Sequence, residues 1–374
     1  MTKLKIILTT LFVAVIIVSL PLKIITTDKD QVIKSENRKV VPFPTIHKVK
    51  KRDIIDFIET LDKYVEDRLP FKEYVFFNFG PYYKRNTNSV DYSNAIEGSN
   101  DWLFLGNNYN NVINQHIHDQ TLDETTRKGF NKRIQEMSRA YPTAFTTVLV
   151  CPDKLGIYWE NIPKYLRGKV EFRFADKKIK NLKENNINVI DLYAALKEAK
   201  KIDTVYYKTD THWNPKGAEA GFREFYKQLS KKISLKKLDY DLYEYGKKDG
   251  FQGDLTHIGG FFWLKETVPV FKPKYKVDWV YNGKEISDYT HLSPELAIPT
   301  NSHFMTNVNA PNKQRVFWCG DSFSSALAPF ITLSFENIRY LSNAQCTLSN
   351  PKFLTEISNF KPNLIVYETV ERDL

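Results

Sequence analysis

Cysteine is scarce in this chain, and its scarcity excludes several kinds of site. The 374 residues include three cysteines, Cys151, Cys319 and Cys346, with no Cys-x-x-Cys pair and no spacing typical of metal ligands. Because the set is small and odd in number, it predicts no disulfide framework. We expect all three to be small buried hydrophobic residues, with a catalytic thiol as the alternative.

The chain also lacks a basic cluster interleaved with aromatic residues, although its formal net charge is +10. Such a cluster is typical of surfaces that bind nucleic acid. The lysines are instead scattered in pairs, as on solvated helix faces. We therefore expect no nucleic-acid partner, whereas an anionic glycan or a membrane surface remains compatible with the charge.

Only one hydrophobic run is long enough to suggest a membrane segment. Ile6–Leu22 carries no charge, follows Lys3 and Lys5, and precedes Lys23. Its length is at the lower limit for a membrane span, and the lack of a small-x-small cleavage site favours an uncleaved anchor over a cleaved signal peptide. The positive-inside rule then predicts a single-pass protein of the cell membrane, with the rest of the chain outside the cytoplasm.

Composition and periodicity divide the chain into four segments. The anchor (1–25) is followed by a polar stalk (26–52) and by a membrane-proximal segment with helical periodicity (53–96). From 97 to 374, short apolar strands alternate with helices, which predicts an α/β domain with a largely parallel sheet. An insertion rich in Tyr, Lys and Pro is expected at about 235–312. Functional loops of such a sheet lie at the carboxyl ends of its strands.

Asp210 and His212 form the first motif that suggests chemistry. A serine hydroxyl is a weak nucleophile, so it needs a neutral imidazole to accept its proton and a carboxylate to orient that imidazole. Two residues apart, Asp210 and His212 can reach one site from a single loop, and Pro215 suits the first turn of the helix that follows. Alone, the pair is a weak signal and favours a structural or surface role.

Gly320-Asp321-Ser322 is the second motif, and it lies where a buried strand changes to helical periodicity. A strand-turn-helix arrangement would expose Ser322 at the edge of the sheet, where backbone N–H groups can stabilise an oxyanion. The same residues, with Ser324, could instead cap an ordinary helix. The motif alone leaves both interpretations open.

Together these motifs resemble a known family. Gly-Asp-Ser on such a turn is similar to the nucleophile block of SGNH esterases, although their Asp-x-x-His block near the C-terminus is absent. Asp-x-His-Trp upstream of Gly-Asp-Ser-Phe resembles the SGNH-like domain of the alginate O-acetyltransferase AlgX/AlgJ family and related DHHW proteins, with Thr211 in place of their first His. Further similar landmarks are Gly98–Gly106, Pro152-Asp153-Lys154, Gly253-Asp254-Leu255, and the stretch from Lys361-Pro362 to Glu371-Arg372.

The resemblance implies a fold and a catalytic triad. The fold is an SGNH-hydrolase-like three-layer α/β domain with a permuted order of catalytic blocks. Ser322 is the implied nucleophile, with His212 as general base and acid and Asp210 as the carboxylate that orients His212. The backbone N–H of Ser322 is the expected oxyanion donor. Further candidates for substrate binding or the oxyanion site are Asp321, Trp213, Asp153, Lys154 and Arg372.

Structural roles are the alternative for most of these further candidates. Asp153 and Lys154 could form a salt bridge in their turn, Trp213 could anchor its loop, and Arg372 could pair with Glu371.

A metal is not expected. His116 and His118 would suggest a metal pair only if an acidic residue joined them.

The implied reaction is transfer of an acetyl group through Ser322 to a hydroxyl of an exopolysaccharide or cell-wall polysaccharide. No coenzyme A site is readable, so no cofactor is expected, and the resemblance implies that a membrane-bound O-acyltransferase partner supplies the acetyl group. One alternative is a carbohydrate acetyl esterase with the same triad. The other is a catalytically silent, glycan-binding subunit of an export complex.

Overall fold

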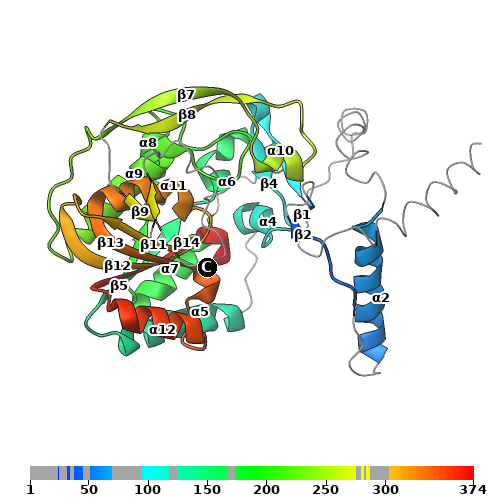
Figure 1. Ribbon diagram of the computed structural model, residues 1–374. Helices are drawn as coiled ribbons and strands as arrows, with labels where there is room; N and C mark the ends of the chain where they lie inside the picture. The colour runs from blue at the N-terminus through cyan, green and yellow to red at the C-terminus, as the bar shows by residue number, and fades with distance from the viewer. Residues whose placement is uncertain are drawn as a thin grey trace, which may run out of the picture. The chain divides into compact units, whose positions relative to one another are not determined.

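The computed structural model of the chain is shown in Figure 1. It describes residues 24, 32–33, 38–44, 51–69, 94–117, 124–164, 166, 173–274, 279–281, 284–286 and 303–374. The chain divides into two compact units, one of residues 1–91 with 254–264 and one of residues 92–253 with 265–374.

In the smaller unit the described elements are short. β1 (Val32–Ile33) pairs antiparallel with β2 (Arg38–Lys39), α2 covers Lys51–Glu66, and α10 covers Asp254–Ile258. No helix within the described ranges is both long enough and apolar enough to cross a membrane. The predicted anchor, Ile6–Leu22, lies outside the described residues.

The larger unit is built on one mixed sheet, whose eight described strands have the order β10-β9-β11-β13-β12-β14-β5-β6. From β13 to β6 all neighbours are parallel, whereas β11, β9 and β10 add an antiparallel edge. The predicted α/β domain with a largely parallel sheet is thus confirmed. The strands are β5 (Phe145–Cys151), β6 (Val189–Asp191), β9 (Trp279–Tyr281), β10 (Lys284–Ile286), β11 (His303–Asn307), β12 (Asn312–Gly320), β13 (Phe335–Ser342) and β14 (Leu364–Val370).

Helices cover both faces of this sheet (Figure 1). On one face, α5 (Glu124–Ala140), α7 (Ala175–Glu184) and α12 (Pro351–Phe360) bury their apolar side chains against β5, β12 and β14. On the other face, α9 (Pro215–Leu229) packs Phe225 against Trp318 of β12. Both faces of β14 are covered, which explains why all seven of its residues are buried. Helices α8 (Tyr193–Ala199), α9 (Pro215–Leu229) and α11 (Ser324–Ser334) form this second layer.

Smaller elements flank the sheet. β3 (Ala95–Glu97) and β4 (Leu103–Leu105) form one antiparallel pair, and β7 (Tyr243–Phe251) and β8 (Glu266–Pro273) form another. The remaining described elements of more than three residues are two short helices, α4 (Val112–Ile117) and α6 (Lys154–Ile157). The segment expected as an insertion, 235–312, thus supplies the β7–β8 hairpin and the antiparallel edge strands β9, β10 and β11.

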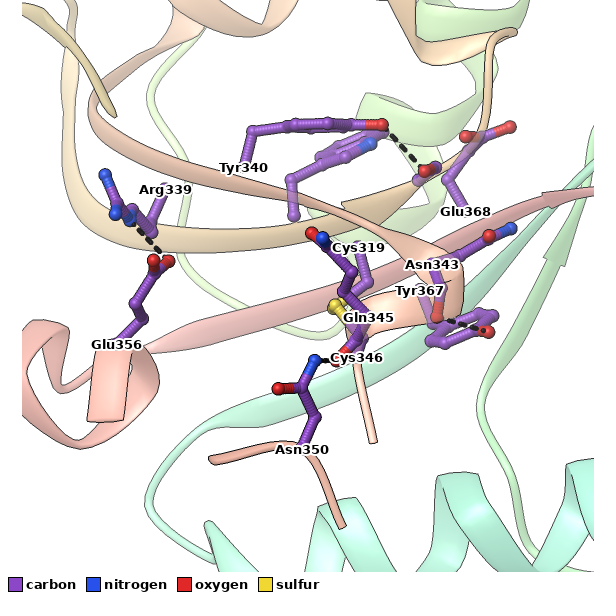
Figure 2. Close-up of a disulfide and its surroundings, with 12 residues drawn as sticks. Cys319, Arg339, Tyr340, Asn343, Gln345, Cys346, Asn350, Glu356, Tyr367 and Glu368 are labelled. Atoms are coloured by element: carbon purple, nitrogen blue, oxygen red, sulfur yellow. Dashed lines mark hydrogen bonds and ion pairs between the residues drawn. A yellow bond between two sulfur atoms is a disulfide. The ribbon is translucent and has the colours of Figure 1, made fainter. Parts of the chain in front are cut away.

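The prediction that the cysteines form no disulfide is wrong for two of them. Cys319, near the end of β12, is bonded to Cys346, which follows β13 (Figure 2). The partners are 27 residues apart in sequence, and no spacing motif predicts their pairing: β13 lies parallel beside β12, and Cys346 follows the turn at the end of β13. Cys151 is a buried free thiol whose pKa is raised well above its usual value by burial. A high pKa disfavours the thiolate that a catalytic cysteine needs.

Candidate active site

The Gly-Asp-Ser turn connects the end of β12 to the start of α11. Ser322 is exposed there, as the sequence predicts for a residue at the edge of the sheet. Gly320 is required because a Cβ at this position would overlap Ser324 Oγ and lie 2.8 Å from both Glu368 Oε2 and Trp318 Nε1. The close approach of these buried polar groups therefore depends on a residue without a side chain.

Asp321 braces this turn through both of its carboxylate oxygens. One carboxylate oxygen accepts the N–H of Phe323 at 2.8 Å, and the other accepts the N–H of Val370 at 2.7 Å. The second bond ties the turn to the end of β14. Asp321 therefore shapes the backbone around Ser322, and its role as a substrate-binding or oxyanion residue stays a prediction.

His212 and Asp210 reach the same place from the loop before α9. Asp210 Oδ1 lies 2.7 Å from His212 Nδ1, and it also accepts the backbone N–H of His212 at 2.9 Å. On the far side of the ring, Nε2 lies 2.7 Å from Ser322 Oγ. If Nδ1 carries the imidazole proton and donates it to Asp210, Nε2 is free to accept the proton of the serine hydroxyl. The three side chains thus form one hydrogen-bonded chain.

Trp213 joins the two loops from inside the protein. Its side chain is fully buried, and its Nε1 donates to the carbonyl of Phe323 at 3.0 Å. The ring also packs against the Phe323 ring with their centres 5.4 Å apart. A fully buried indole cannot wall an open pocket, so Trp213 has the anchoring role that the sequence left as the alternative.

Asp153 and Lys154 begin α6 at the carboxyl end of β5, and both are buried. Asp153 pairs with Arg372 near the end of the chain. Lys154 Nζ instead donates to the main-chain carbonyls of Tyr207, Lys208 and Asp210. Neither side chain faces solvent, so neither is in a position to line an open substrate site.

Behind this turn lies a buried ion network. Arg372 pairs with Asp153, and Arg173 pairs with Glu371 at 2.6 Å. Burial is the largest influence on Asp153 and opposes its ionisation, but Arg372 and His116 together outweigh burial and hold the pKa of this carboxyl below its usual value. Arg372 also lies over the ring of Phe323, 5.7 Å from its centre. In place of the Glu371–Arg372 pair that the sequence suggested, Arg372 pairs with Asp153, and Glu371 pairs with Arg173.

His116 extends this network. Acidic residues therefore lie beside one of the two histidines that the sequence analysis considered as a metal pair. Its Nε2 lies 3.5 Å from Glu371 Oε1 and 3.9 Å from Asp153 Oδ2, and the three side chains are close enough to share an ion. Each carboxylate already pairs with an arginine, however, and that positive charge opposes a further cation. His118 lies outside the described residues. We interpret the cluster as an ion network that holds the turn of Asp153.

Glu368 is a site residue that the sequence analysis missed. It is fully buried in β14, where its Oε2 accepts the backbone N–H of Asp321 at 2.9 Å and the hydroxyl of Ser324. Its Oε1 lies 3.1 Å from Cys151 Sγ. Figure 2 shows it on the face of β14 opposite to Tyr367. A glutamate within an otherwise apolar strand was the available signal, because such a charge is rarely buried without partners.

The raised pKa of buried Glu368 predicts that the stability of the fold depends on pH. Burial, aided by the nearby charge of Asp321, raises the pKa of Glu368 well above its usual value. Between the unfolded and folded pKa values, the folded state holds a proton that the unfolded chain has lost. The free energy of unfolding therefore falls as pH rises, by at most about 1.4 kcal/mol per pH unit for this group.

Glu368→Gln should remove this contribution, because an amide does not titrate. Its oxygen can still accept the two hydrogen bonds that Oε2 accepts from Asp321 and Ser324. In urea unfolding from pH 5 to pH 8, the variant is expected to gain stability relative to the unchanged chain as pH rises. Parallel stability curves for the two proteins would contradict the assigned protonation of Glu368.

Several classes of serine-dependent enzyme place an Asp-His-Ser chain at the strand ends of a largely parallel α/β domain, and SGNH-hydrolase-like proteins are one of them. Within that class, the family described as "SGNH hydrolase-like domain, acetyltransferase AlgX" matches residues 95–285, about half of the chain. The chain belongs to this family, which confirms the resemblance found in the sequence. Asp210 and His212 lie inside the matched range, whereas Ser322 lies beyond it.

Individual relatives are distant. "Probable alginate O-acetylase AlgJ" of Pseudomonas putida is 24% identical over 168 residues, which make up 44% of this chain and 41% of that protein. The chain thus matches about two fifths of the length of this relative. Bacillus cereus PatB1 has a similar fold, with a TM-score of 0.53 and 16% identity over 74% of this chain and 96% of PatB1. Its structure with a sulfonyl adduct gives 0.54 and 15%, over 75% and 96%.

Proposed function

We propose that this protein is a serine-dependent O-acetyltransferase, which carries an acetyl group on Ser322 and passes it to a hydroxyl of a polysaccharide. The observation that carries the proposal is the unbroken chain of 2.7 Å contacts from Asp210 through His212 to the exposed Ser322. Membership of an acetyltransferase family supports the choice of an acetyl group. The name of the AlgJ relative supports a polysaccharide as acceptor.

The proposed reaction has two matched halves. His212 Nε2 takes the proton of Ser322 Oγ as this oxygen attacks the carbonyl carbon of the donor ester, and the backbone N–H of Ser322 faces the developing oxyanion. The intermediate collapses to an acetyl-serine, and His212 returns the proton to the departing oxygen. A sugar hydroxyl then gives its proton to Nε2 and attacks the acetyl carbon, and Ser322 Oγ leaves and recovers the proton.

We place this reaction outside the cytoplasm. The Cys319–Cys346 disulfide supports that location, because disulfides persist in oxidising compartments and are rare in the cytosol. In this proposal the predicted anchor at Ile6–Leu22 holds the protein at the membrane, and a membrane-bound O-acyltransferase partner supplies the acetyl group.

Mass spectrometry tests the acyl-enzyme directly. After incubation of the purified chain with 4-nitrophenyl acetate, one acetyl group is expected on the peptide that contains Ser322. Ser322→Ala should lose it, whereas Ser325→Ala, which removes a nearby hydroxyl without a hydrogen-bond partner, should keep it. Because PatB1 is known with a sulfonyl adduct, a sulfonyl fluoride is a second probe for the same residue. An adduct that persists in Ser322→Ala would refute the proposed nucleophile.

The acceptor separates a transferase from an esterase. With the acetylated enzyme in hand, candidate polysaccharides should speed the loss of the acetyl group from Ser322 and become acetylated themselves. An acetyl-serine that decays at one rate with and without every glycan, releasing only acetate, would favour the esterase.

A further inference from the structure

Lys154 is the first residue of α6, which follows the carboxyl end of β5 after a two-residue turn, and its side chain is buried rather than exposed to solvent. The residue is 4% exposed. Its ammonium group donates to three main-chain carbonyls, those of Tyr207 at 3.2 Å, Lys208 at 3.2 Å and Asp210 at 2.6 Å. All three belong to the loop that carries the Asp210–His212 pair. One buried cation therefore gathers the backbone on which two members of the proposed triad depend.

The contact with Asp210 is the shortest of the three and the most informative. A hydrogen bond to the Asp210 carbonyl fixes the peptide plane between Asp210 and Thr211, and this plane sets the directions of the side chains on either side. The loop closes through the bond from the N–H of Tyr207 to the carbonyl of His212 at 3.3 Å. Lys154 thus acts inside a closed turn whose shape determines where His212 points.

The surroundings of Lys154 favour a charged ammonium group at a fixed place. The rings of Trp102 and Phe104 lie with their centres 5.8 and 5.5 Å from Nζ, a range in which aromatic faces attract a cation. The backbone beside it is also held, because the N–H of Asp153 donates to Glu371 Oε1 at 2.8 Å. The buried ion network therefore fixes the backbone from which the Lys154 side chain extends.

We propose that Lys154 is a positioning residue for the acetyl-transfer reaction. It holds the Asp210 loop so that His212 Nε2 stays within hydrogen-bond reach of Ser322 Oγ. This inference rests on the proposed function of Ser322, although the orientation of His212 can be measured without any reaction. Without the ammonium group, three carbonyls lose a shared donor and the loop can relax away from Ser322.

Three variants of the full chain test this role. Lys154→Met removes the charge at similar side-chain length, Lys154→Arg restores a cation and N–H donors, and Lys200→Met is the matched control. Lys200 also donates to a nearby main-chain carbonyl, that of Ile157 at 2.5 Å, and its other hydrogen bonds go to the carboxylate of Glu160 rather than to the Asp210 loop. The two measurements are the rate at which 4-nitrophenyl acetate acetylates Ser322, and the low-field proton resonance of the His212 Nδ1–H bonded to Asp210.

Lys154→Met is expected to slow acetylation on the order of 10-fold, because water entering the site can satisfy the carbonyls but cannot fix the loop. The apparent KM for the ester should stay within about twofold, and the low-field resonance should weaken. Lys154→Arg should recover part of both signals, and Lys200→Met should change neither. If Lys154→Met does not fold, Lys154→Gln, which keeps two N–H donors, replaces it with the same expectation in milder form.

Different results would refute the positioning role of Lys154 and the proposed function of Ser322. A Lys154→Met chain that folds, acetylates Ser322 at the original rate and keeps the low-field resonance would overturn the positioning role. If the unchanged protein never acetylates Ser322, the proposed function fails, and the resonance alone then decides the role of Lys154.

Discussion

Asp210→Asn is expected to lower the rate of acetyl transfer by about 10²- to 10⁴-fold while the fold stays intact. A single oxygen of Asp210 accepts both the backbone N–H and the Nδ1–H of His212. This arrangement keeps the imidazole proton on Nδ1 and leaves Nε2 as the acceptor for Ser322. It also places a negative charge beside the imidazolium that forms during the reaction.

The amide can fail in two ways, depending on which of its groups faces the ring. If the NH₂ group faces Nδ1, the imidazole proton moves to Nε2, and His212 can no longer accept the proton of Ser322. If the oxygen faces Nδ1, the tautomer is kept, but the imidazolium loses its countercharge. The second arrangement also satisfies the backbone N–H, so we expect the variant to fold normally.

The measurement is the burst of 4-nitrophenolate that accompanies acetylation of Ser322. Asp203→Asn is the matched control, because Asp203 pairs with Lys216 at the surface near the same loop. It should stay within about twofold of the unchanged protein. A rate for Asp210→Asn within a few-fold of the original would show that Asp210 does not orient the base.

Local pattern explains what could be predicted of this molecule. Strands that are buried on both faces need continuous apolar sequence. Three apolar runs accordingly fall in β5, β12 and β14: Phe145–Cys151, Arg315–Cys319 and Asn363–Tyr367, of which the last begins one residue before its strand. The turn after Gly320 and the proline before α9 are also local signals. With the family resemblance, these signals sufficed to select Ser322, His212 and Asp210, which the structure brings into one hydrogen-bonded chain.

Contacts between distant residues explain what could not be predicted. The Cys319–Cys346 bond depends on β13 lying beside β12, since Cys346 follows the end of β13, and no sequence spacing encodes that pairing of strands. In the sequence, Lys154 and Asp153 are neighbouring charged residues of one turn, and the pattern does not distinguish their roles. One binds carbonyls of a loop more than fifty residues later, and the other binds Arg372 near the end of the chain. Their partners follow from the packing of the strand ends.

Gly253 gives the second large expected effect, through direct contact with the backbone of Asp210. A Cβ at Gly253 would lie 2.5 Å from the Cα and 2.6 Å from the N of Asp210, which is closer than real Cβ contacts come. The N–H of Gly253 also donates to Thr209 Oγ1 at 3.0 Å, so the two segments are held together. Gly253→Ala must therefore push Asp210 or lose this bond.

We expect Gly253→Ala to lower the free energy of unfolding by about 1–3 kcal/mol, the usual cost of overpacking. The rate of Ser322 acetylation should fall about 10²-fold, because displacement of Asp210 moves His212 away from the serine. Gly246→Ala is the control from the same segment. Its added Cβ would meet the flexible end of Lys272 rather than backbone, and that side chain can move aside.

A double variant separates displacement of Asp210 from a general loss of packing. If Gly253→Ala acts through Asp210, then adding it to Asp210→Asn should reduce the acetylation rate by much less than the 10²-fold or so expected of it alone, since the orienting carboxylate is already lost. The loss of stability should still appear in full. Rate losses that multiply would mean that Gly253 acts on the site by a route independent of Asp210.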